Sequence, residues 1–452
     1  MKVLDLNRDG GIGANCLSLE IGPFHIVVDA GLHPKKAGHE AMPDFSKIDG
    51  KAIDFFILTH CHLDHLGALP VILREHPESP VLMSIPSTTL APRMLHNSCN
   101  VMKRQGKEQD IAEYPLFTHG EIDFLQAQFK GMPYGHTQHF TKGDEEILIT
   151  FYSAGHVVGA GAVLLEYKHR KIFLTGDVLF HRQRILNAAD FPEDRFDTVI
   201  LETTRGETPG DPNLTREGEV KRLLETVNHT LIHGGSVLIP VFALGRMQEV
   251  LTLIRDAQVS GDLIKSPVFC SGLGMDLANY FDAIHRKTGL VDFQRKVLKD
   301  LNLRPLPRKL KPGQNPGESG VYVVSSGMLV ENTPSYTVAS CVLGNSHNTI
   351  CYVGYCDPDT PGGKMLAQDS HSDFIFETLD LVVPMKARIE RFELSGHADR
   401  EEIFDFTLKA QPRAVVLTHG DPAARDWFAN AFREARPELK VFDPTPGQIY
   451  TV

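Results

Sequence analysis

The stretch THCHLDH places four possible metal ligands within six residues: His60, His62, Asp64 and His65. Imidazole nitrogens and carboxylate oxygens are the ligands that zinc accepts in proteins. His60 and His62 are two positions apart where a strand-like apolar run ends, so their rings can point the same way. Asp64 and His65 follow on a turn and can face a point slightly further along. The spacing therefore predicts that one short segment contributes ligands to two adjacent metal ions.

Three further ligand-type residues follow strand-like runs: His156 in SAGH, Asp177 in TGD and His419 in LTHGD. Alone, each is typical of a structural residue at the end of a strand. Together with the first segment they make seven candidate ligands, which suits two metal ions bridged by one carboxylate. The histidine-rich set favours two Zn²⁺ ions, with Mn²⁺ as an alternative. We assign His60, His62 and His156 to the first ion, Asp64, His65 and His419 to the second, and Asp177 to the bridge.

The elements that must position these ligands fall into two patterns. The first part of the chain reads as strands and hairpins, with a fully buried strand over 52–58 and a helix over 65–76. From about residue 206, helices and strands alternate, which indicates βα units around a parallel sheet. After about residue 385, strands that end in ligand-type residues return. The first kind of sheet is therefore expected to be interrupted and then resumed.

Length and composition set broader limits. A chain of 452 residues is too long for one ordinary core, so two domains or a domain with an insertion is expected. There is no apolar run long enough to span a membrane, and the first residues lack the apolar core of a secretory signal. Seven scattered cysteines fit a reducing cytoplasm. The net charge of −11 argues against a generally basic nucleic-acid binder, although bound metal ions create a local positive field.

One segment departs from this acidic balance. The stretch RKVLKDLNLRPLPRKLK is rich in cations, and it allows two interpretations, a solvated surface loop or a rim that faces RNA. Its cationic residues are Arg295, Lys296, Lys299, Arg304, Arg308, Lys309 and Lys311.

The motifs resemble those of a known superfamily. THCHLDH, SAGH and TGD resemble the ligand motifs of the metallo-β-lactamase fold, and LETTRG, LSGHAD and LTHGD resemble three additional motifs of its β-CASP branch of RNA-processing nucleases. LIPVFALGRMQE and SSGML further resemble the cleavage and polyadenylation endonucleases. The resemblance implies an α/β fold, with a four-layered αβ/βα metallo-β-lactamase domain and an inserted β-CASP domain built around a parallel sheet. The expected bounds are 1–205 and 385–452 for the first domain and 206–384 for the insertion.

The resemblance also implies a mechanism. Glu202 and His397 correspond to the branch's carboxylate–histidine pair beside the metals, and His419 corresponds to its last metal ligand. We expect a hydroxide that bridges the metals near Asp177, and proton donation by His397, oriented by Glu202, to the leaving 3′ oxygen. Asp64 and Asp177 complete the residues expected to be catalytic. The predicted activity is a zinc-dependent ribonuclease, endonucleolytic, 5′-to-3′ exonucleolytic or both.

Expectations for substrate binding are less direct. Ser325, Ser326 and Gly327 in SSGM follow a strand and can present N–H groups to a phosphate, and Arg246 is a candidate contact to the RNA backbone. Single-stranded RNA is the expected partner, in a cleft between the domains. Two positions depart from the pattern of the branch and concern substrate contacts. Gly363 replaces a common arginine, with Lys364 next to it, and Cys356 replaces a common glutamine.

Several alternatives stay open. A small-molecule hydrolase, such as a thioesterase or lactonase, explains the metal motifs equally well but not the insertion, Glu202 or His397. A non-catalytic RNA-processing subunit is expected to have lost ligands, whereas every expected position is occupied here. A DNA nuclease is disfavoured because the histidine in LTHGD resembles the RNA-type choice. The mode of cleavage, the RNA recognised, the oligomeric state and protein partners are left open.

Overall fold

The computed structural model describes residues 1–270, 272–307, 310–370 and 372–452 and divides the chain into two compact units. The first unit contains residues 1–182, 188–210 and 397–452, and the second contains residues 183–187 and 211–396. The expected bounds of an inserted domain, 206–384, stay a prediction. The boundary between the units falls within LSGH. Residues 394–396 belong to the second unit, and His397 belongs to the first.

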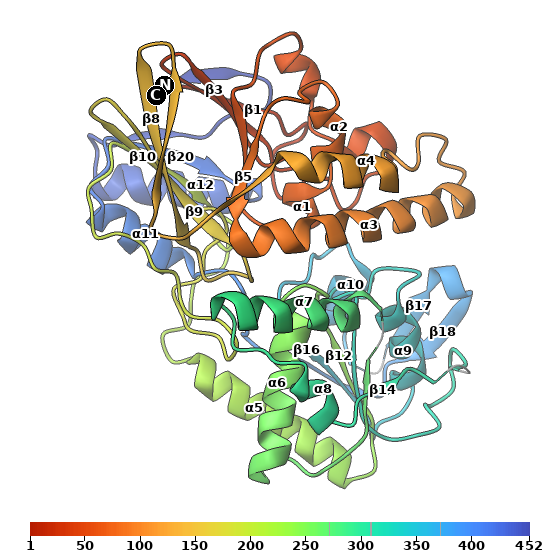
Figure 1. Ribbon diagram of the computed structural model, residues 1–452. Helices are drawn as coiled ribbons and strands as arrows, with labels where there is room; N and C mark the ends of the chain where they lie inside the picture. The colour runs from red at the N-terminus through yellow and green to blue at the C-terminus, as the bar shows by residue number, and fades with distance from the viewer. Residues whose placement is uncertain (271, 308–309, 371) are drawn as a thin grey trace. The chain divides into compact units, whose positions relative to one another are not determined.

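The first unit is built on two seven-stranded sheets (Figure 1). The first sheet has the order β22-β1-β2-β3-β4-β5-β6. Its pairs are antiparallel from β22 to β3 and parallel from β3 to β6. Its strands are β1 (Lys2–Asp5), β2 (Leu17–Ile21), β3 (Phe24–Val28), β4 (Phe55–Leu58), β5 (Val81–Ser84), β6 (Phe129–Met132) and β22 (Ile449–Thr451).

The second sheet has the order β21-β20-β11-β10-β9-β8-β7 and combines strands from the two ends of the chain. β11 pairs in parallel with both β10 and β20, so residues after 414 enter a sheet that began near residue 137. Its strands are β7 (Thr137–Lys142), β8 (Glu145–Ser153), β9 (Gly161–Tyr167), β10 (Arg170–Leu174), β11 (Thr198–Glu202), β20 (Ala414–Thr418) and β21 (Lys440–Phe442).

Helices cover the outer faces of both sheets (Figure 1). Apolar side chains from both sheets form one core between them. Ile26 and Ile57 of the first sheet share this core with Ile149 and Val416 of the second. The layers are therefore helix, sheet, sheet and helix, which confirms the expected αβ/βα order. The covering helices are α1 (Leu63–Leu66), α2 (Leu69–Leu73), α3 (Ile85–Glu108) and α4 (His119–Leu125) on one side, and α11 (Arg400–Lys409) and α12 (Pro422–Ala435) on the other.

The second unit is built on a six-stranded sheet in the order β14-β13-β15-β12-β16-β19, whose strands all pair in parallel, as expected. Its strands are β12 (Val237–Pro240), β13 (Val268–Cys270), β14 (Arg304–Pro305), β15 (Val321–Val324), β16 (Thr349–Tyr352) and β19 (Arg388–Arg391). A separate antiparallel pair contains β17 (Asp373–Phe376) and β18 (Leu381–Pro384). The helices are α5 (Arg216–Ile232), α6 (Arg246–Ser260), α7 (Leu273–Thr288), α8 (Lys296–Asp300), α9 (Pro334–Val342) and α10 (Pro361–Ala367).

Residues 183–187 belong to the second unit, although the residues on both sides of them belong to the first. The buried carboxylate of Glu249 on α6 accepts the backbone N–H groups of Arg184 and Ile185, at 2.8 and 3.0 Å. The Arg184 guanidinium also pairs with Asp256 and Asp292. These contacts explain why five residues of this loop belong to the second unit.

Two features differ from expectation. The helix predicted over 65–76 is two short helices, α1 and α2, because the chain breaks at Gly67 and Ala68. The longest helix, α3, was not expected, although Ser84 caps it by accepting the N–H of Ser87 at 3.3 Å. Among the described residues, 3₁₀ turns also occur at Gly38–Ala41, Phe45–Ile48, Gln126–Gln128 and Glu377–Leu379. Within the described ranges, no helix combines the length and the apolar character needed to cross a bilayer.

Candidate metal centre

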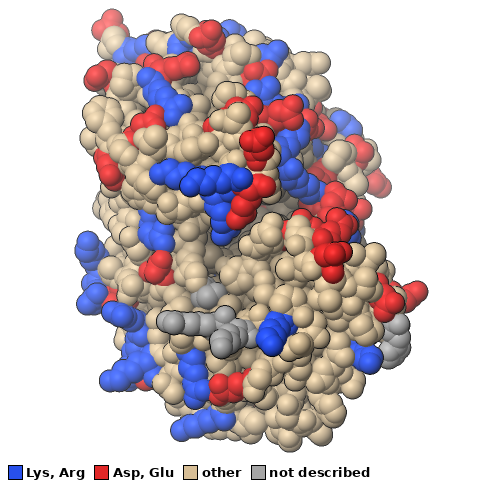
Figure 2. Space-filling model, turned by 90° about the vertical axis from the view of Figure 1, so that its right-hand side faces the viewer, with Lys and Arg blue, Asp and Glu red and all other residues tan. Residues whose placement is uncertain are grey.

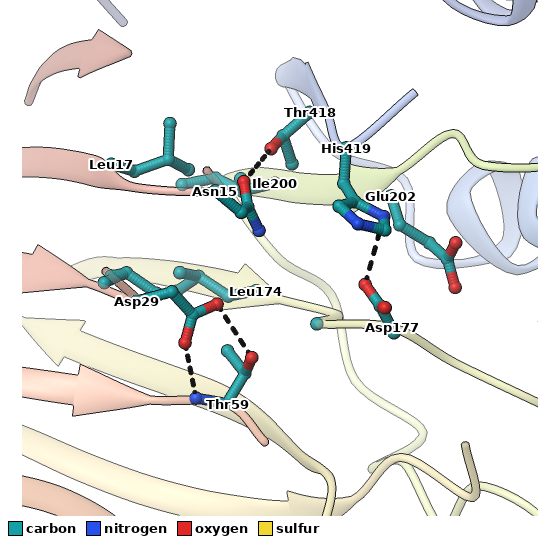
Figure 3. Close-up of a pocket in the computed structure, with 12 residues that line it drawn as sticks. Asn15, Leu17, Asp29, Thr59, Leu174, Asp177, Ile200, Glu202, Thr418 and His419 are labelled. Atoms are coloured by element: carbon teal, nitrogen blue, oxygen red, sulfur yellow. Dashed lines mark hydrogen bonds and ion pairs between the residues drawn. The ribbon is translucent and has the colours of Figure 1, made fainter. Parts of the chain in front are cut away.

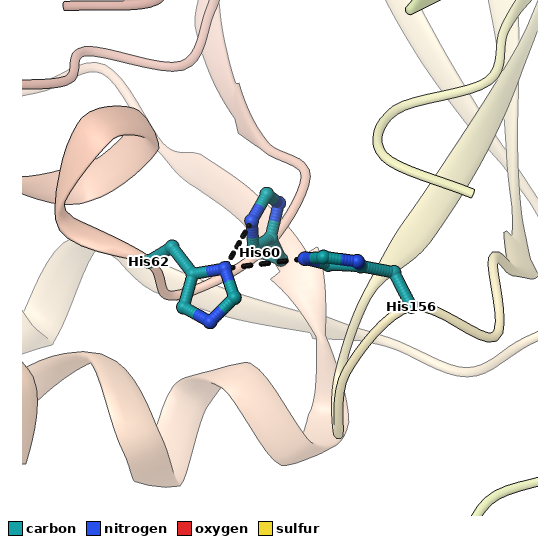
Figure 4. A group of neighbouring side chains, drawn as sticks. All are labelled: His60, His62 and His156. Carbon is teal, nitrogen blue, oxygen red and sulfur yellow. Dashed lines mark hydrogen bonds between the residues drawn. The ribbon is translucent and has the colours of Figure 1, made fainter. Parts of the chain in front are cut away.

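Three histidines converge at the end of β4 (Figure 4). The Nε2 atoms of His60 and His156 lie 3.1 and 3.2 Å from Nδ1 of His62, which brings one nitrogen of each ring to a common point. His60 and His62 follow β4, whereas His156 lies in the loop between β8 and β9. His60 is 0% exposed, so its position is fixed by the surrounding core. This is the set that the sequence assigned to the first ion.

A second group lies beside the first. Nε2 of His65 is 3.3 Å from Nε2 of His419 and 3.7 Å from Oδ2 of Asp64. Asp64 and His65 lie on α1, and His419 follows β20 with a positive φ of 47° that turns the chain immediately after the strand. The parallel pairing of β20 with β11 brings His419 to His65, which lies 354 positions earlier in the sequence.

Asp177 lies where it can join the two groups. Its Oδ2 is 3.6 Å from Nε2 of His60 and 3.5 Å from Nε2 of His65, and its Oδ1 is 3.3 Å from Nδ1 of His419. The residue follows Gly176, whose φ of +54° provides the turn after β10. One carboxylate thus contacts ligands of both groups, which is the arrangement a bridging ligand needs.

The charges of the site are mutually dependent. Burial disfavours the charged form of His60 and, together with the neighbouring His65, lowers its pKa well below the ordinary value. His65 behaves oppositely: despite burial, the carboxylates of Asp177 and Asp64 raise its pKa. Asp177 is equally buried, but His419 and His65 lower its pKa. The carboxylates are therefore held as anions among imidazoles.

Asp29 fixes the orientation of His65 and was not identified from the sequence. Figure 3 shows Asp29 beside Thr59, with its carboxylate joined to that residue by two hydrogen bonds. Its Oδ2 accepts the Nδ1 hydrogen of His65 at 2.8 Å, and its two oxygens accept the backbone N–H and the hydroxyl of Thr59, each at 2.8 Å. A carboxylate bound to the far nitrogen of a ligating histidine selects its tautomer and orients its ring. The sequence offered only a weak signal, an aspartate that follows a strand-like run in VVDAG.

Glu202 and His397 form a pair at the edge of this centre. Nδ1 of His397 is 2.9 Å from Oε2 and 3.2 Å from Oε1 of Glu202, and the His397 ring lies 4.5 Å from that of His156 between centroids. Glu202 is 1% exposed, and its Oε1 accepts the N–H of Val178 at 2.6 Å. Burial disfavours the imidazolium of His397, but the carboxylate of Glu202, helped by those of Asp177 and Asp64, raises its pKa above the ordinary value.

The chemistry of the donors fits metal ions. Five groups of three ligand-type residues each bring their donor atoms within 4.8 Å of one another. A neutral imidazole carries only one ring hydrogen, so nitrogens that face one another at such distances repel unless a proton or a cation lies between them. A cation shared by three donors satisfies them together, and nitrogen and carboxylate donors are those that zinc takes.

The four predicted substrate-binding residues lie in the second unit, and their role stays a prediction. Arg246 begins α6 and is only 8% exposed, with Nη1 lacking a hydrogen-bond partner among the described residues. Ser325, Ser326 and Gly327 follow β15 directly. Part of their hydrogen-bonding capacity is already used, because the Ser326 hydroxyl accepts the N–H of Val330 at 2.8 Å.

The two departures from the pattern of the branch have local structural reasons. A Cβ atom at Gly363 would lie 2.1 Å from the carbonyl oxygen of Asp357, so this backbone does not accept an arginine there. Lys364 is exposed on the same helix, α10. Cys356 packs into the core of the second unit, where burial raises the pKa of its thiol to about 11.

Comparison with known proteins places two family domains on the chain. Residues 18–206 match a metallo-beta-lactamase superfamily domain, and residues 382–442 match a Zn-dependent metallo-hydrolase RNA specificity domain. These segments together contain the THCHLDH, SAGH, TGD, LETT, LSGH and LTHGD motifs.

Similar whole proteins come from eukaryotes and archaea. The chain is 28% identical to Integrator complex subunit 11 of Gallus gallus over 100% of its own length and 74% of the relative's. It is 27% identical to Endoribonuclease ysh1 of Schizosaccharomyces pombe, over 98% of this chain and 58% of that one. It is also 27% identical to Transcription termination factor FttA of Pyrococcus abyssi, over 93% and 67% of the two chains.

Among solved structures, a protein of unknown function from Enterococcus faecalis V583 has the same fold. The two superpose with a TM-score of 0.56 at 12% sequence identity, covering 100% of this chain and 99% of the other.

Proposed function

Because the chain belongs to the metallo-beta-lactamase superfamily and carries that superfamily's RNA specificity domain, we propose that it is a metal-dependent ribonuclease. The observation that carries the proposal is the Glu202–His397 pair beside the ligand groups, since hydrolysis of a phosphodiester needs a proton donor for the leaving oxygen as well as metal ligands. The similarity to proteins named endoribonucleases supports cleavage within the RNA chain.

We propose two zinc ions for this centre. His60, His62 and His156 would hold one, Asp64, His65 and His419 the other, and Asp177 would contact both. When bound, such ions activate water near neutral pH and offset negative charge on the phosphate.

The remaining steps belong to side chains of this protein. His397 holds a proton, because Glu202 stabilises its imidazolium form, and delivers it to the leaving 3′ oxygen. Glu202 contributes by orientation: its Oε1 is occupied by the N–H of Val178, so the carboxylate cannot rotate away from His397. Asp29 acts on His65 in a similar way, and it fixes a ligand rather than a proton donor.

The proposal is tested by incubating the zinc-loaded protein with 5′-labelled single-stranded RNA carrying either a monophosphate or a triphosphate. Internal fragments from both substrates are the expected result. Release of mononucleotides from the monophosphate RNA alone would instead identify a 5′-to-3′ exonuclease. Hydrolysis of thioesters or lactones in a parallel panel, with RNA left intact, would overturn the proposal.

A further inference from the structure

The second unit carries a concentrated positive surface in an acidic protein. Residues 295–311 contain seven cationic residues and one acidic residue, Asp300, whereas the whole chain has a net charge of −11. Two of the cations, Arg308 and Lys309, lie outside the described residues. We call the other five the basic strip: Arg295, Lys296, Lys299, Arg304 and Lys311. Figure 2 shows Lys and Arg side chains gathered toward the lower left of the view, with few Asp or Glu among them.

The backbone of the basic strip is anchored, so its charges are held in place. Val297 lies within α8 and Leu301 follows its last residue, and both side chains are buried. The backbone N–H of Arg295 donates to Oδ1 of Asp282 on α7, at 3.0 Å. Further along, Arg304 pairs in register with Phe269 at the edge of the six-stranded sheet. An unstructured solvated loop would not have these anchors at both ends of α8.

Most cationic side chains of the basic strip are not paired with a carboxylate of the described residues. Within the described parts of the chain, Arg295, Lys296, Lys299 and Lys311 form no ion pair, and all four are exposed. Arg304 is the exception, since its guanidinium pairs with Glu318 at 2.5 Å. Elsewhere on the surface, lysines such as Lys221 and Lys409 lie near a glutamate. Unpaired like charges on a fixed backbone repel one another, and a polyanion relieves this repulsion.

We propose that the basic strip binds the phosphate backbone of RNA, as a contact surface separate from the metal ligands. The proposal rests on the ribonuclease function and extends it, because it assigns part of RNA affinity to the second unit. Its side chains act through charge on phosphates, so the contact is expected to be independent of base sequence and sensitive to salt.

The test measures binding rather than cleavage. The metal-free full-length protein is titrated against fluorescent single-stranded RNA by anisotropy, from about 50 to 200 mM salt. Arg295, Lys296 and Lys299 are replaced together by glutamine. The control replaces Lys107, Lys130 and Lys265, which are exposed lysines outside the strip, by glutamine, so the net charge changes equally. Thermal melting checks that all three proteins are folded.

Removal of three phosphate contacts is expected to reduce the slope of log affinity against log salt by about 2, and to weaken binding about tenfold or more at low salt. The control is expected to match the unaltered protein. Equal losses in both variants would show that only net charge matters and would overturn the proposal, as would a strip variant with unchanged affinity. An unaltered protein that neither binds nor cleaves RNA would instead overturn the ribonuclease function.

Discussion

Nδ1 of His397 lies 2.9 Å from Oε2 of Glu202, a residue 195 positions earlier in the chain. The two residues come from separate parts of the sequence, and both belong to the first unit. Glu202 ends β11, and His397 precedes α11, so the pair is fixed by the framework of the second sheet. Because neither residue is one of the seven proposed metal ligands, the effect of proton donation on catalysis can be measured separately from the effect of metal binding.

Replacement of His397 by alanine is expected to lower kcat on RNA by about 10²–10⁴-fold, the usual contribution of a positioned general acid. The metal content should stay the same, because the seven proposed ligands are intact. Turnover and elemental analysis of the same preparation measure both quantities. His139, which is exposed and pairs with Glu146 on the second sheet, provides the control substitution to alanine. A His397 variant with full activity would remove the assignment of this residue.

Replacement of His62 by alanine is expected to lower the zinc content from about two ions to about one per chain, because His62 belongs to only one of the ligand groups. The ion held by Asp64, His65 and His419 should remain. Elemental analysis after dialysis measures the ratio, with the His139 variant again as control. Loss of both ions would indicate that the two groups bind cooperatively, and retention of both would exclude His62 as a ligand.

Replacement of Asp29 by asparagine is expected to weaken zinc binding by about 10–100-fold, as is typical when the partner of a ligating histidine is lost. The reason is that Asp29 holds Nδ1 of His65 at 2.8 Å and leaves Nε2 available to the metal. Competition with a chelator measures the affinity. Asp54 is a matched control. It accepts the N–H of His25 and forms an ion pair with Lys142, and it does not contact a proposed metal ligand. Equal affinities for both variants would contradict this role.

Asp5 provides a prediction about pH and stability. Burial raises the pKa of its carboxyl to about 6, despite the N–H of Asn7 and the charge of Arg425. The folded protein therefore binds this proton more tightly than the unfolded chain. The resulting stabilisation is complete below about pH 4 and is lost as pH rises through about 6.

Replacement of Asp5 by asparagine removes this titration. Relative to the unaltered protein, the free energy of unfolding of the variant is expected to improve by about 2 kcal/mol between pH 4 and pH 7. Urea unfolding at both pH values measures the difference. A constant difference across that range would show that Asp5 does not titrate in this way.

Much of the fold followed from local patterns in the sequence. Strands such as β4 and β11 are fully buried apolar runs, and each leads directly to a site residue. The break between α1 and α2 was missed because LGALPVIL has helical spacing, while Gly67 packs against Leu32, where a side chain would collide. The helix α3 was missed because its sequence contains Pro92 and many residues with weak helix preference. Packing on β5 and β6 stabilises it instead.

The candidate ligands were recognisable because a dense motif such as THCHLDH has few structural explanations, and the structure brings these residues together. Asp29 was not recognisable, because a single aspartate after a strand has many possible structural roles. Only its contact with His65 distinguishes it. For Arg246 the burial was not foreseen from the sequence, and its role as an RNA contact stays a prediction. A helix-start arginine suggests an exposed contact, yet the packing of α6 buries its side chain. Burial of individual polar residues depends on tertiary packing and is not encoded in spacing.

The distance of 354 positions between His65 and His419 has a consequence for biosynthesis. A ribosome makes proteins from the amino end, so the THCHLDH segment leaves the exit tunnel long before β20 is translated. Until β20 pairs with β11, the nascent polypeptide offers only part of the proposed set of metal ligands. The proposed metal centre is therefore expected to become complete only after β20 has been synthesised and has paired with β11.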